Sequence, residues 1–240
     1  VLRGFVALAH PMAPQLVAEL GVDSRCIAVI PDPALRDDEI AASPVPQPHR
    51  GEGRRFLAVA RLNRQKNLPL LLEAFALIAR NGDRLLIAGE GPERARIEHR
   101  IAALGLGERV TLAGHVADVR PLLDESHALV LSSDYEGVPA AVIEALAAGR
   151  PIATTECCAS MRWLVQDGAF GALAPVRDAG ALAEAMASAA AMTPPAEEMH
   201  RFSSLFTLGK AAPAYVAEMQ GLVAADAVHR LSRAEPAAPC

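Results

Sequence analysis

Short aliphatic runs alternate with longer amphipathic segments along most of the chain. The runs are predicted strands, and the amphipathic segments are predicted helices. Strands are predicted at 56–60, 85–89, 110–114, 128–132, 151–155 and 171–176, and helices at 68–80, 92–104, 118–125, 139–148, 158–166 and 178–191. Each strand is a continuous aliphatic run, which is typical of strands covered by helices on both faces. The alternation therefore predicts an α/β fold with a doubly wound parallel sheet, built from right-handed βαβ units.

The two ends of the chain depart from this pattern. The first 30 residues read as one βαβ-like unit, and a segment rich in proline and glycine follows it. The elements expected at the ends are strands at 4–8 and 26–30 and helices at 11–20, 193–206 and 210–231. Because Val1 stands almost inside a predicted strand, we expect the first unit to be the remnant of a longer N-terminal domain. The expected organisation is a domain remnant (1–30), a linker (31–53), a main domain (54–192), C-terminal helices (193–233) and a frayed tail (234–240).

Composition narrows the class of protein. Hydrophobic residues make up 52% of the chain and aromatic residues only 4%, so the core should be aliphatic. A net charge of −5 argues against a protein that binds nucleic acid through a basic face. The four cysteines and seven histidines show no metal-binding spacing, and no apolar run approaches the roughly 18 residues of a membrane span. We expect a cytoplasmic protein without a metal centre or a membrane segment.

The stretch from residue 129 to residue 149 carries the most chemical information. It reads as a buried strand, a tight loop and a helix, with Pro139 suited to the first helical turn. Unpaired N–H groups and the dipole at such a helix start favour an anion. Glu136 and Glu144 lie eight positions apart, one in the loop and one in the helix, and carboxylates accept hydrogen bonds from hydroxyl groups. The pair fits a ligand with a phosphate between two sugars, although two solvated glutamates would give the same pattern.

A second candidate loop follows the strand at 56–60. Arg61 and Lys66 leave the carboxyl end of that strand, where ligands of parallel sheets collect, and together they suit a diphosphate. A solvated basic loop is the alternative. The GEGP turn at 89–92 lacks the full G-x-G-x-x-G fingerprint, because Arg94 stands at its third glycine position. This disfavours a dinucleotide-dependent oxidoreductase.

Four other side chains are weaker candidates. His115 lies at a strand end and could line the pocket, but an ordinary half-buried histidine fits equally well. Trp163 is expected to pack in the core. Cys157 and Cys158 lie near a helix start, which can lower a thiol pKa, yet a structural role is favoured for both.

Taken together, four segments resemble the nucleotide-sugar-binding domain of GT-B type glycosyltransferases, specifically the retaining glycosyltransferase family 4. The segments are ARLNRQKN (60–67), IAGEGP (87–92), VTLAGHV (110–116) and EGVPAAVIEALAAGRPI (136–152), the last with the E-x₇-E spacing of the family. The resemblance covers roughly residues 54–190 and implies a Rossmann-like domain.

The resemblance also implies roles for individual residues. Arg61 and Lys66 would hold the diphosphate of a nucleotide sugar and, with Glu136, form the catalytic set. Glu136 would contact hydroxyls of the donor sugar, and Glu144 would accept hydrogen bonds from the ribose. The backbone near Val116 would lie against the base. Backbone amides for sugar and phosphate would come from Gly137, Val138, Pro139 and Ala140.

The reaction implied by the resemblance is transfer of a glycosyl unit with retention of configuration. No metal and no cofactor besides the donor substrate are expected, because the basic pair and the helix start offset the leaving-group charge. The acceptor, a sugar, a lipid or another small molecule, would bind the missing domain. Through that domain the full-length protein could associate peripherally with the inner face of a membrane, although these residues do not support it.

Three departures from the family pattern stand out. Ala60 replaces the usual glycine before the arginine, and the segment CCASMRW places Trp163 where the family has glutamate. With most of the first domain missing, the final helix should also expose an apolar face. Two alternatives stay open: a non-catalytic nucleotide-sugar-binding module, or another GT-B enzyme such as an epimerase or an inverting transferase. The Arg61/Lys66 segment upstream of E-x₇-E favours family 4.

Overall fold

The computed structural model describes residues 4–41 and 53–233; most of the predicted linker beyond residue 41 and the predicted frayed tail lie outside them. Its centre is a six-stranded parallel sheet in the order β5-β4-β3-β6-β7-β8. The strands are β3 (Arg55–Val59), β4 (Arg84–Ala88), β5 (Val110–Gly114), β6 (Ala128–Leu131), β7 (Ile152–Thr155) and β8 (Gly171–Ala174). The chain winds outward from β3 to β5 and then returns to β6 beside β3. This confirms the predicted doubly wound, Rossmann-like sheet.

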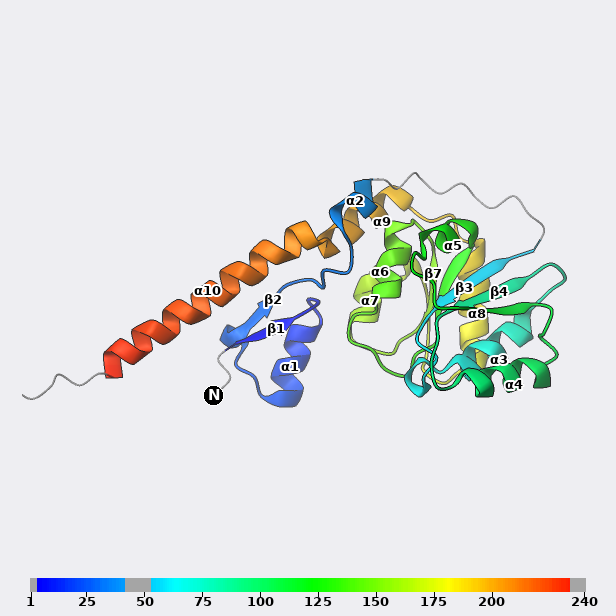
Figure 1. The fold of residues 1–240 in the computed structure, drawn as a ribbon, viewed down its shortest axis with the longest axis horizontal. Helices are drawn as coiled ribbons and strands as arrows, with labels where there is room; N and C mark the ends of the chain where they lie inside the picture. Colours follow the sequence, from blue (N-terminus) through cyan, green and yellow to red (C-terminus); the bar gives the residue numbers. More distant parts are fainter. Residues whose placement is uncertain (1–3, 42–52, 234–240) are drawn as a thin grey trace, which may run out of the picture.

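Helices cover both faces of the sheet, as Figure 1 shows. One face carries α3 (Leu68–Ile78), α4 (Arg94–Ala103) and α8 (Ala179–Ala191), and the other carries α5 (Arg120–Glu125), α6 (Ala140–Ala147), α7 (Ser160–Leu164) and α9 (Ala196–Ser203). Each face has its own aliphatic core. Side chains such as Leu71, Leu72 and Ile143 are fully buried, and burying one of this size contributes about 1.5–3 kcal/mol.

The predicted element boundaries hold to within a few residues, and at α7 the backbone shows why the helix is shorter than predicted. That helix ends at Leu164 instead of continuing to residue 166. Gln166 and Asp167 have φ values of 47° and 51°, and such left-handed residues end a helix. A 3₁₀ turn, η3 (Gln166–Gly168), follows.

The N-terminal unit forms the predicted βαβ arrangement. β1 (Phe5–Ala7) and β2 (Ile27–Val29) pair with each other in parallel. Between them in the chain lie α1 (Met12–Leu20) and a 3₁₀ turn, η1 (Ser24–Cys26). Gly21 ends α1 in the left-handed conformation at φ 64°. Glycine adopts this conformation readily because it has no Cβ, so Gly21 is a glycine C-cap.

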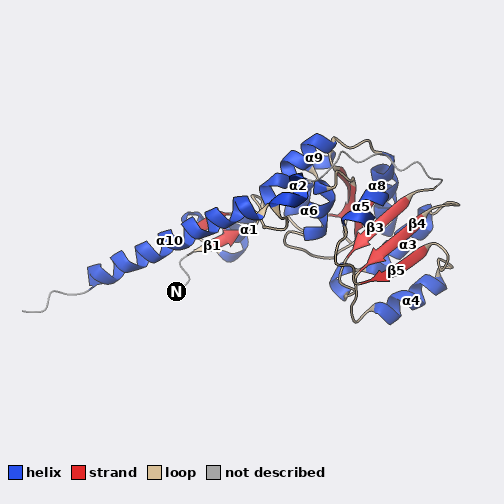
Figure 2. Cartoon of the chain, turned by 45° about the horizontal axis from the view of Figure 1, so that its top comes forward, coloured by secondary structure: helices blue, strands red, loops and turns tan. Residues whose placement is uncertain are grey.

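The last helix, α10 (Leu208–Arg233), runs away from the six-stranded sheet alongside the β1–β2 unit, and Figures 1 and 2 show it from two directions. Gly4 of the unit lies against the Leu222 side chain. Val216, Met219 and Val223 of α10 remain 48%, 56% and 70% exposed. The exposed apolar face predicted for this helix is therefore present.

One helix lies where the sequence predicts only linker. α2 (Asp37–Ala41) is a single short helix in which a Glu39 carboxylate oxygen accepts a hydrogen bond from the backbone N–H of Arg36, at 2.7 Å. Leu35, just before it, exchanges backbone hydrogen bonds with Phe206 and Leu208. Five residues carry too little periodicity to be read from sequence, and these tertiary contacts fix the helix instead.

Trp163 packs as the sequence predicts. Its ring meets those of Phe202 and Phe206 edge-on, with centroids 5.0 and 5.6 Å apart. His10 of the N-terminal unit approaches the same ring at 6.0 Å. Trp163 thus belongs to an aromatic cluster with Phe202 of α9 and Phe206. It does not line the cleft that holds the candidate site.

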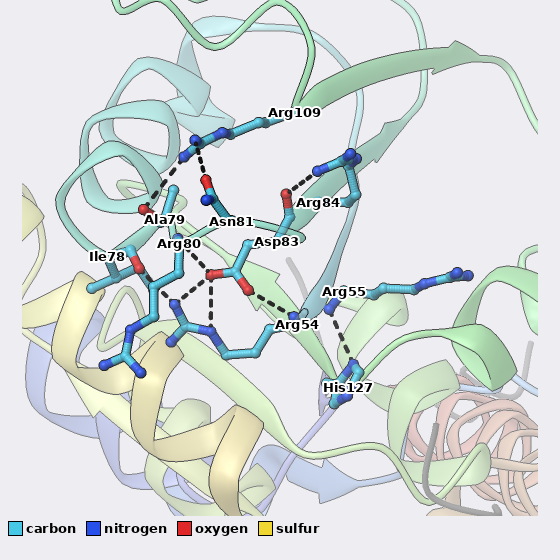
Figure 3. Close-up of polar contacts among 10 residues, drawn as sticks. All are labelled: Arg54, Arg55, Ile78, Ala79, Arg80, Asn81, Asp83, Arg84, Arg109 and His127. Carbon is cyan, nitrogen blue, oxygen red and sulfur yellow. Dashed lines mark hydrogen bonds and ion pairs between the residues drawn. The ribbon is translucent and has the colours of Figure 1, made fainter. Parts of the chain in front are cut away.

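Buried ion pairing holds the amino-terminal end of the sheet (Figure 3). Asp83, only 2% exposed, accepts hydrogen bonds from the Arg54 side chain and from the backbone N–H groups of Arg54 and Arg80. Burial alone would raise the pKa of Asp83, but these donors hold it below its ordinary value. Arg54 at this end of the sheet therefore has a structural partner.

Candidate functional site

A cleft of about 1190 Å³ opens at the carboxyl ends of the central strands. It lies over the point between β3 and β6 where the strand order reverses, which is where open α/β sheets bind ligands. Seven of the nine residues predicted for the site line it: Arg61, Lys66, Val116, Glu136, Pro139, Ala140 and Glu144. Gly137 and Val138 lie beside it without lining it.

The loop after β3 is fastened to the loop after β6. The Ser132 hydroxyl donates to the Lys66 carbonyl at 2.8 Å, and the backbone N–H of Asp134 donates to the Gln65 carbonyl at the same distance. The Asn67 amide donates to the Asp134 carboxylate at 2.9 Å, with Asn67 itself left-handed at φ 43°. These bonds place the basic loop and the Glu136 loop in one rigid unit.

Glu136 is held by three side-chain donors. Its Oε1 accepts from the Lys66 ammonium at 2.5 Å and from the Ser133 hydroxyl at 2.6 Å, and its Oε2 lies 3.4 Å from the Gln65 amide. The side chains of Lys66 and Glu136 are 18% and 8% exposed. Sequence reasoning missed Ser133 and Gln65, although both stand in the two loops that it singled out.

Arg61 is the second cation of the site. Arg61 is exposed and lines the cleft. Its guanidinium has no ion-pair partner among the described residues. Arginine is always charged and offers a planar fork of donors that suits phosphate oxygens. The guanidinium is therefore available to a ligand, whereas the neighbouring ammonium of Lys66 is already paired.

The start of α6 forms the floor between the two glutamates. Pro139 is its N-cap, with an extended conformation at ψ 115°, so the helix begins at Ala140. Pro139 has no N–H, which corrects its expected role as an amide donor. Ala140 and Ala141 line the cleft and hold the first N–H groups of the helix, at the positive end of its dipole. An anion at this point would be favoured.

Glu144 stands at the far end of the cleft, one and a half turns along α6. Burial raises its pKa above the ordinary value, and the carboxylates of Glu39 and Asp118 raise it further. Glu39 comes from α2 and Asp118 from the loop after β5, next to Val116. Sequence reasoning assigned neither residue to the site. Glu39 falls in the segment that is predicted to be a linker.

The cysteine pair borders the Glu136 loop. The Cys158 thiol lies 3.2 Å from the Gly137 carbonyl oxygen, and Cys157 is buried behind it. The hydrogen bond between the two thiols lowers the pKa of Cys158 to about 7 and raises the pKa of Cys157. Both thiols are free, and Cys158 contacts the loop at the Gly137 carbonyl oxygen.

The ionised Glu144 carboxylate should destabilise the folded protein. Its pKa is higher in the folded state, so the ionised carboxylate is unfavourable above that pKa and the cost disappears as the pH falls toward the ordinary value of 4.5. We expect Glu144→Gln to raise the free energy of unfolding at pH 7.5 by about 0.5–1 kcal/mol. Urea denaturation at pH 7.5 and pH 5 measures this, and the gain should shrink at the lower pH. Glu98→Gln, at an exposed residue of α4, is the control. A Glu144→Gln protein less stable than wild type at pH 7.5 would contradict the expectation.

Among the side chains that the structure describes, no group of three or more histidine, cysteine, aspartate or glutamate residues is arranged to hold a metal ion. None of the helices described combines the length and the apolar character that crossing a membrane requires.

The sequence pattern of one family, described as "Glycosyl transferases group 1", matches residues 53–191. The chain belongs to this family. The matched range contains the six-stranded sheet and every predicted site residue, so most of the cleft lies in a group 1 glycosyltransferase domain. The residues outside the match are the N-terminal unit, α2 and the last two helices.

Individual relatives agree with the assignment. The chain is 34% identical to the amylovoran biosynthesis glycosyltransferase AmsK of Erwinia amylovora over 139 residues, which are 54% of this chain and 34% of AmsK. It spans about a third of the length of the curated relatives it matches.

Solved structures agree with the fold. The apo form of the lipopolysaccharide outer core galactosyltransferase WaaB has a TM-score of 0.77 at 21% identity, over 91% of this chain and 62% of that one. HepE of Anabaena in complex with UDP has a TM-score of 0.72 at 17% identity, over 91% of this chain and 64% of that one. At these identities the likeness concerns the GT-B glycosyltransferase fold alone.

Proposed function

We propose that this chain is the donor-binding part of a retaining glycosyltransferase of family 4 and that its cleft binds a nucleotide diphosphate sugar. The observation that carries the proposal is the meeting of two cations, two glutamates and a helix N-terminus in one cleft. Family membership supplies the reaction type, and the solved HepE complex contains UDP.

Each part of the donor then has a partner in the cleft. Arg61, Lys66 and the N–H groups at the start of α6 would hold the diphosphate and offset the charge that develops on the leaving group. Glu136 would accept hydrogen bonds from the donor sugar through its Oε2. Val116 would lie against the base, and Glu144 would accept hydrogen bonds from the ribose. No metal is needed for charge neutralisation in this scheme.

The acceptor side follows from the family and not from the cleft. We propose that transfer of the sugar to an acceptor sugar, lipid or other small molecule uses a further domain that packs on the β1–β2 unit and α10. The free thiols of Cys157 and Cys158 suit a reducing cytoplasm, where we place the protein.

Binding of the donor is tested by calorimetric titration. We expect one of UDP, GDP and ADP, and the corresponding nucleotide sugar, to bind with heat in a folded sample. Glu144→Ala should weaken that binding by about tenfold or more, because hydrogen bonds to a charged group contribute about 1.5–3 kcal/mol. Glu98→Ala, at an exposed glutamate outside the cleft, should leave the affinity within about twofold. Absence of heat with all three nucleotides and their sugars would overturn the proposal.

A further inference from the structure

Lys66 and Glu136 neutralise one another inside the cleft. Their 2.5 Å ion pair is largely shielded from water, with side chains 18% and 8% exposed. The pair stands beside the start of α6, where the diphosphate of the donor is placed above. A diphosphate therefore meets an attractive ammonium and a repulsive carboxylate at almost the same point.

The pair can stay intact when a ligand binds. Lys66 uses one of its three ammonium hydrogens on Glu136 Oε1, which leaves two for a phosphate. Ser133 donates to the same Oε1, while Oε2 has only a long 3.4 Å contact with the Gln65 amide. Oε2 is thus the oxygen with room for hydroxyl donors, and Oε1 keeps the carboxylate fixed and charged.

The charge of the terminal phosphate differs between substrate and product. In a nucleotide sugar this phosphate is a diester with about one negative charge, whereas the free nucleoside diphosphate ends in a monoester with about 1.5 to 2. The Glu136 carboxylate repels this extra charge, which reduces the attraction that Arg61, Lys66 and the start of α6 exert on the free nucleoside diphosphate. The sugar, in contrast, brings hydroxyl groups that donate to Oε2.

We propose that Glu136, held charged by Lys66 and Ser133, makes the cleft discriminate against the free nucleoside diphosphate in favour of the nucleotide sugar. This inference rests on the proposed donor binding. Its consequence is that the loss of the sugar turns a hydrogen-bonded contact at Glu136 into a charge repulsion, which speeds release of the leaving nucleotide after transfer.

The test compares three ligands on wild type and Glu136→Gln. They are the nucleoside diphosphate that wild type binds most tightly among UDP, GDP and ADP, its glucose derivative, and its methyl ester on the terminal phosphate. The methyl ester removes the extra charge without supplying sugar hydroxyls. Glutamine keeps the shape of the side chain, and Glu136→Ala provides a second variant without the charge. Glu98→Gln is the matched control, and circular dichroism checks the fold.

We expect Glu136→Gln to tighten binding of the free diphosphate by about tenfold and to weaken binding of the glucose derivative by about tenfold. The methyl ester should gain at least threefold less than the free diphosphate, and Glu136→Ala should shift the free diphosphate in the same direction. If the variants bind the free diphosphate no more tightly than wild type does, or the methyl ester gains as much, the inference is wrong although donor binding stands. If wild type binds none of the ligands, the proposed function itself has failed.

Discussion

Lys66→Met is expected to weaken binding of the nucleoside diphosphate by about a hundredfold and to lower the free energy of unfolding by about 3 kcal/mol. The first effect follows from the loss of a shielded cation at the diphosphate. The second follows because Glu136, only 8% exposed, keeps its charge but loses the ammonium at 2.5 Å. The Ser133 hydroxyl and the distant Gln65 amide cannot replace that charge.

A double variant separates the two effects. Lys66→Met with Glu136→Gln removes both charges, so most of the lost stability should return while nucleotide binding stays weak. Lys210→Met is the matched control, because this lysine lies on α10 outside the cleft and, among the described residues, its ammonium donates only to the Ser204 hydroxyl. Calorimetric titration and urea denaturation measure the two quantities. A single Lys66→Met variant with wild-type affinity would remove Lys66 from the site.

The sheet could be predicted from the sequence because its signal is local. Runs such as FLAVA (56–60) and ALVL (128–131) are too uniformly apolar for a solvated strand, and each is followed by a helix that can serve as a crossover. The alternation predicts a doubly wound parallel sheet, whereas the strand order β5-β4-β3-β6-β7-β8 comes from the structure. The basic loop and the two glutamates then fall at strand ends on one edge of the sheet, which explains why Arg61, Lys66, Glu136 and Glu144 meet.

The rest of the site depends on contacts between distant segments. Glu39 reaches Glu144 only because α2 is fixed by backbone bonds between Leu35 and the segment at residues 206–208. The sequence of the five residues of α2 does not predict that placement. Ser133 is a local case: it lies three residues before Glu136, but the direction of its side chain within the loop cannot be read from the sequence. Pro139 is a different case: the missing N–H is visible in the sequence and could have excluded it as a donor.

The structure shows why Gly89, the first residue of the GEGP turn, must be glycine, which the sequence alone leaves open. Gly89 has a φ of 143°, and a Cβ on it would lie 1.9 Å from the carbonyl oxygen of Ala60. Its N–H donates to the Gly114 carbonyl at 2.7 Å, so the backbone is confined from both sides. The loops after β3, β4 and β5 therefore touch backbone to backbone at this residue.

Gly89→Ala is accordingly expected to lower the free energy of unfolding by about 3–4 kcal/mol, from backbone strain together with the overlap. The neighbouring loop cannot yield cheaply, because the Ala60 N–H is bonded to the Ala88 carbonyl at 3.0 Å. Any relaxation must move the segment that carries Arg61 and Lys66, so the folded fraction should also bind nucleotide at least tenfold more weakly. Gly107→Ala is the control, since a Cβ there meets nothing within 4 Å, and it should stay within about 0.5 kcal/mol of wild type. Equal urea midpoints for the two variants would show that the loops are not packed as closely as the structure has them.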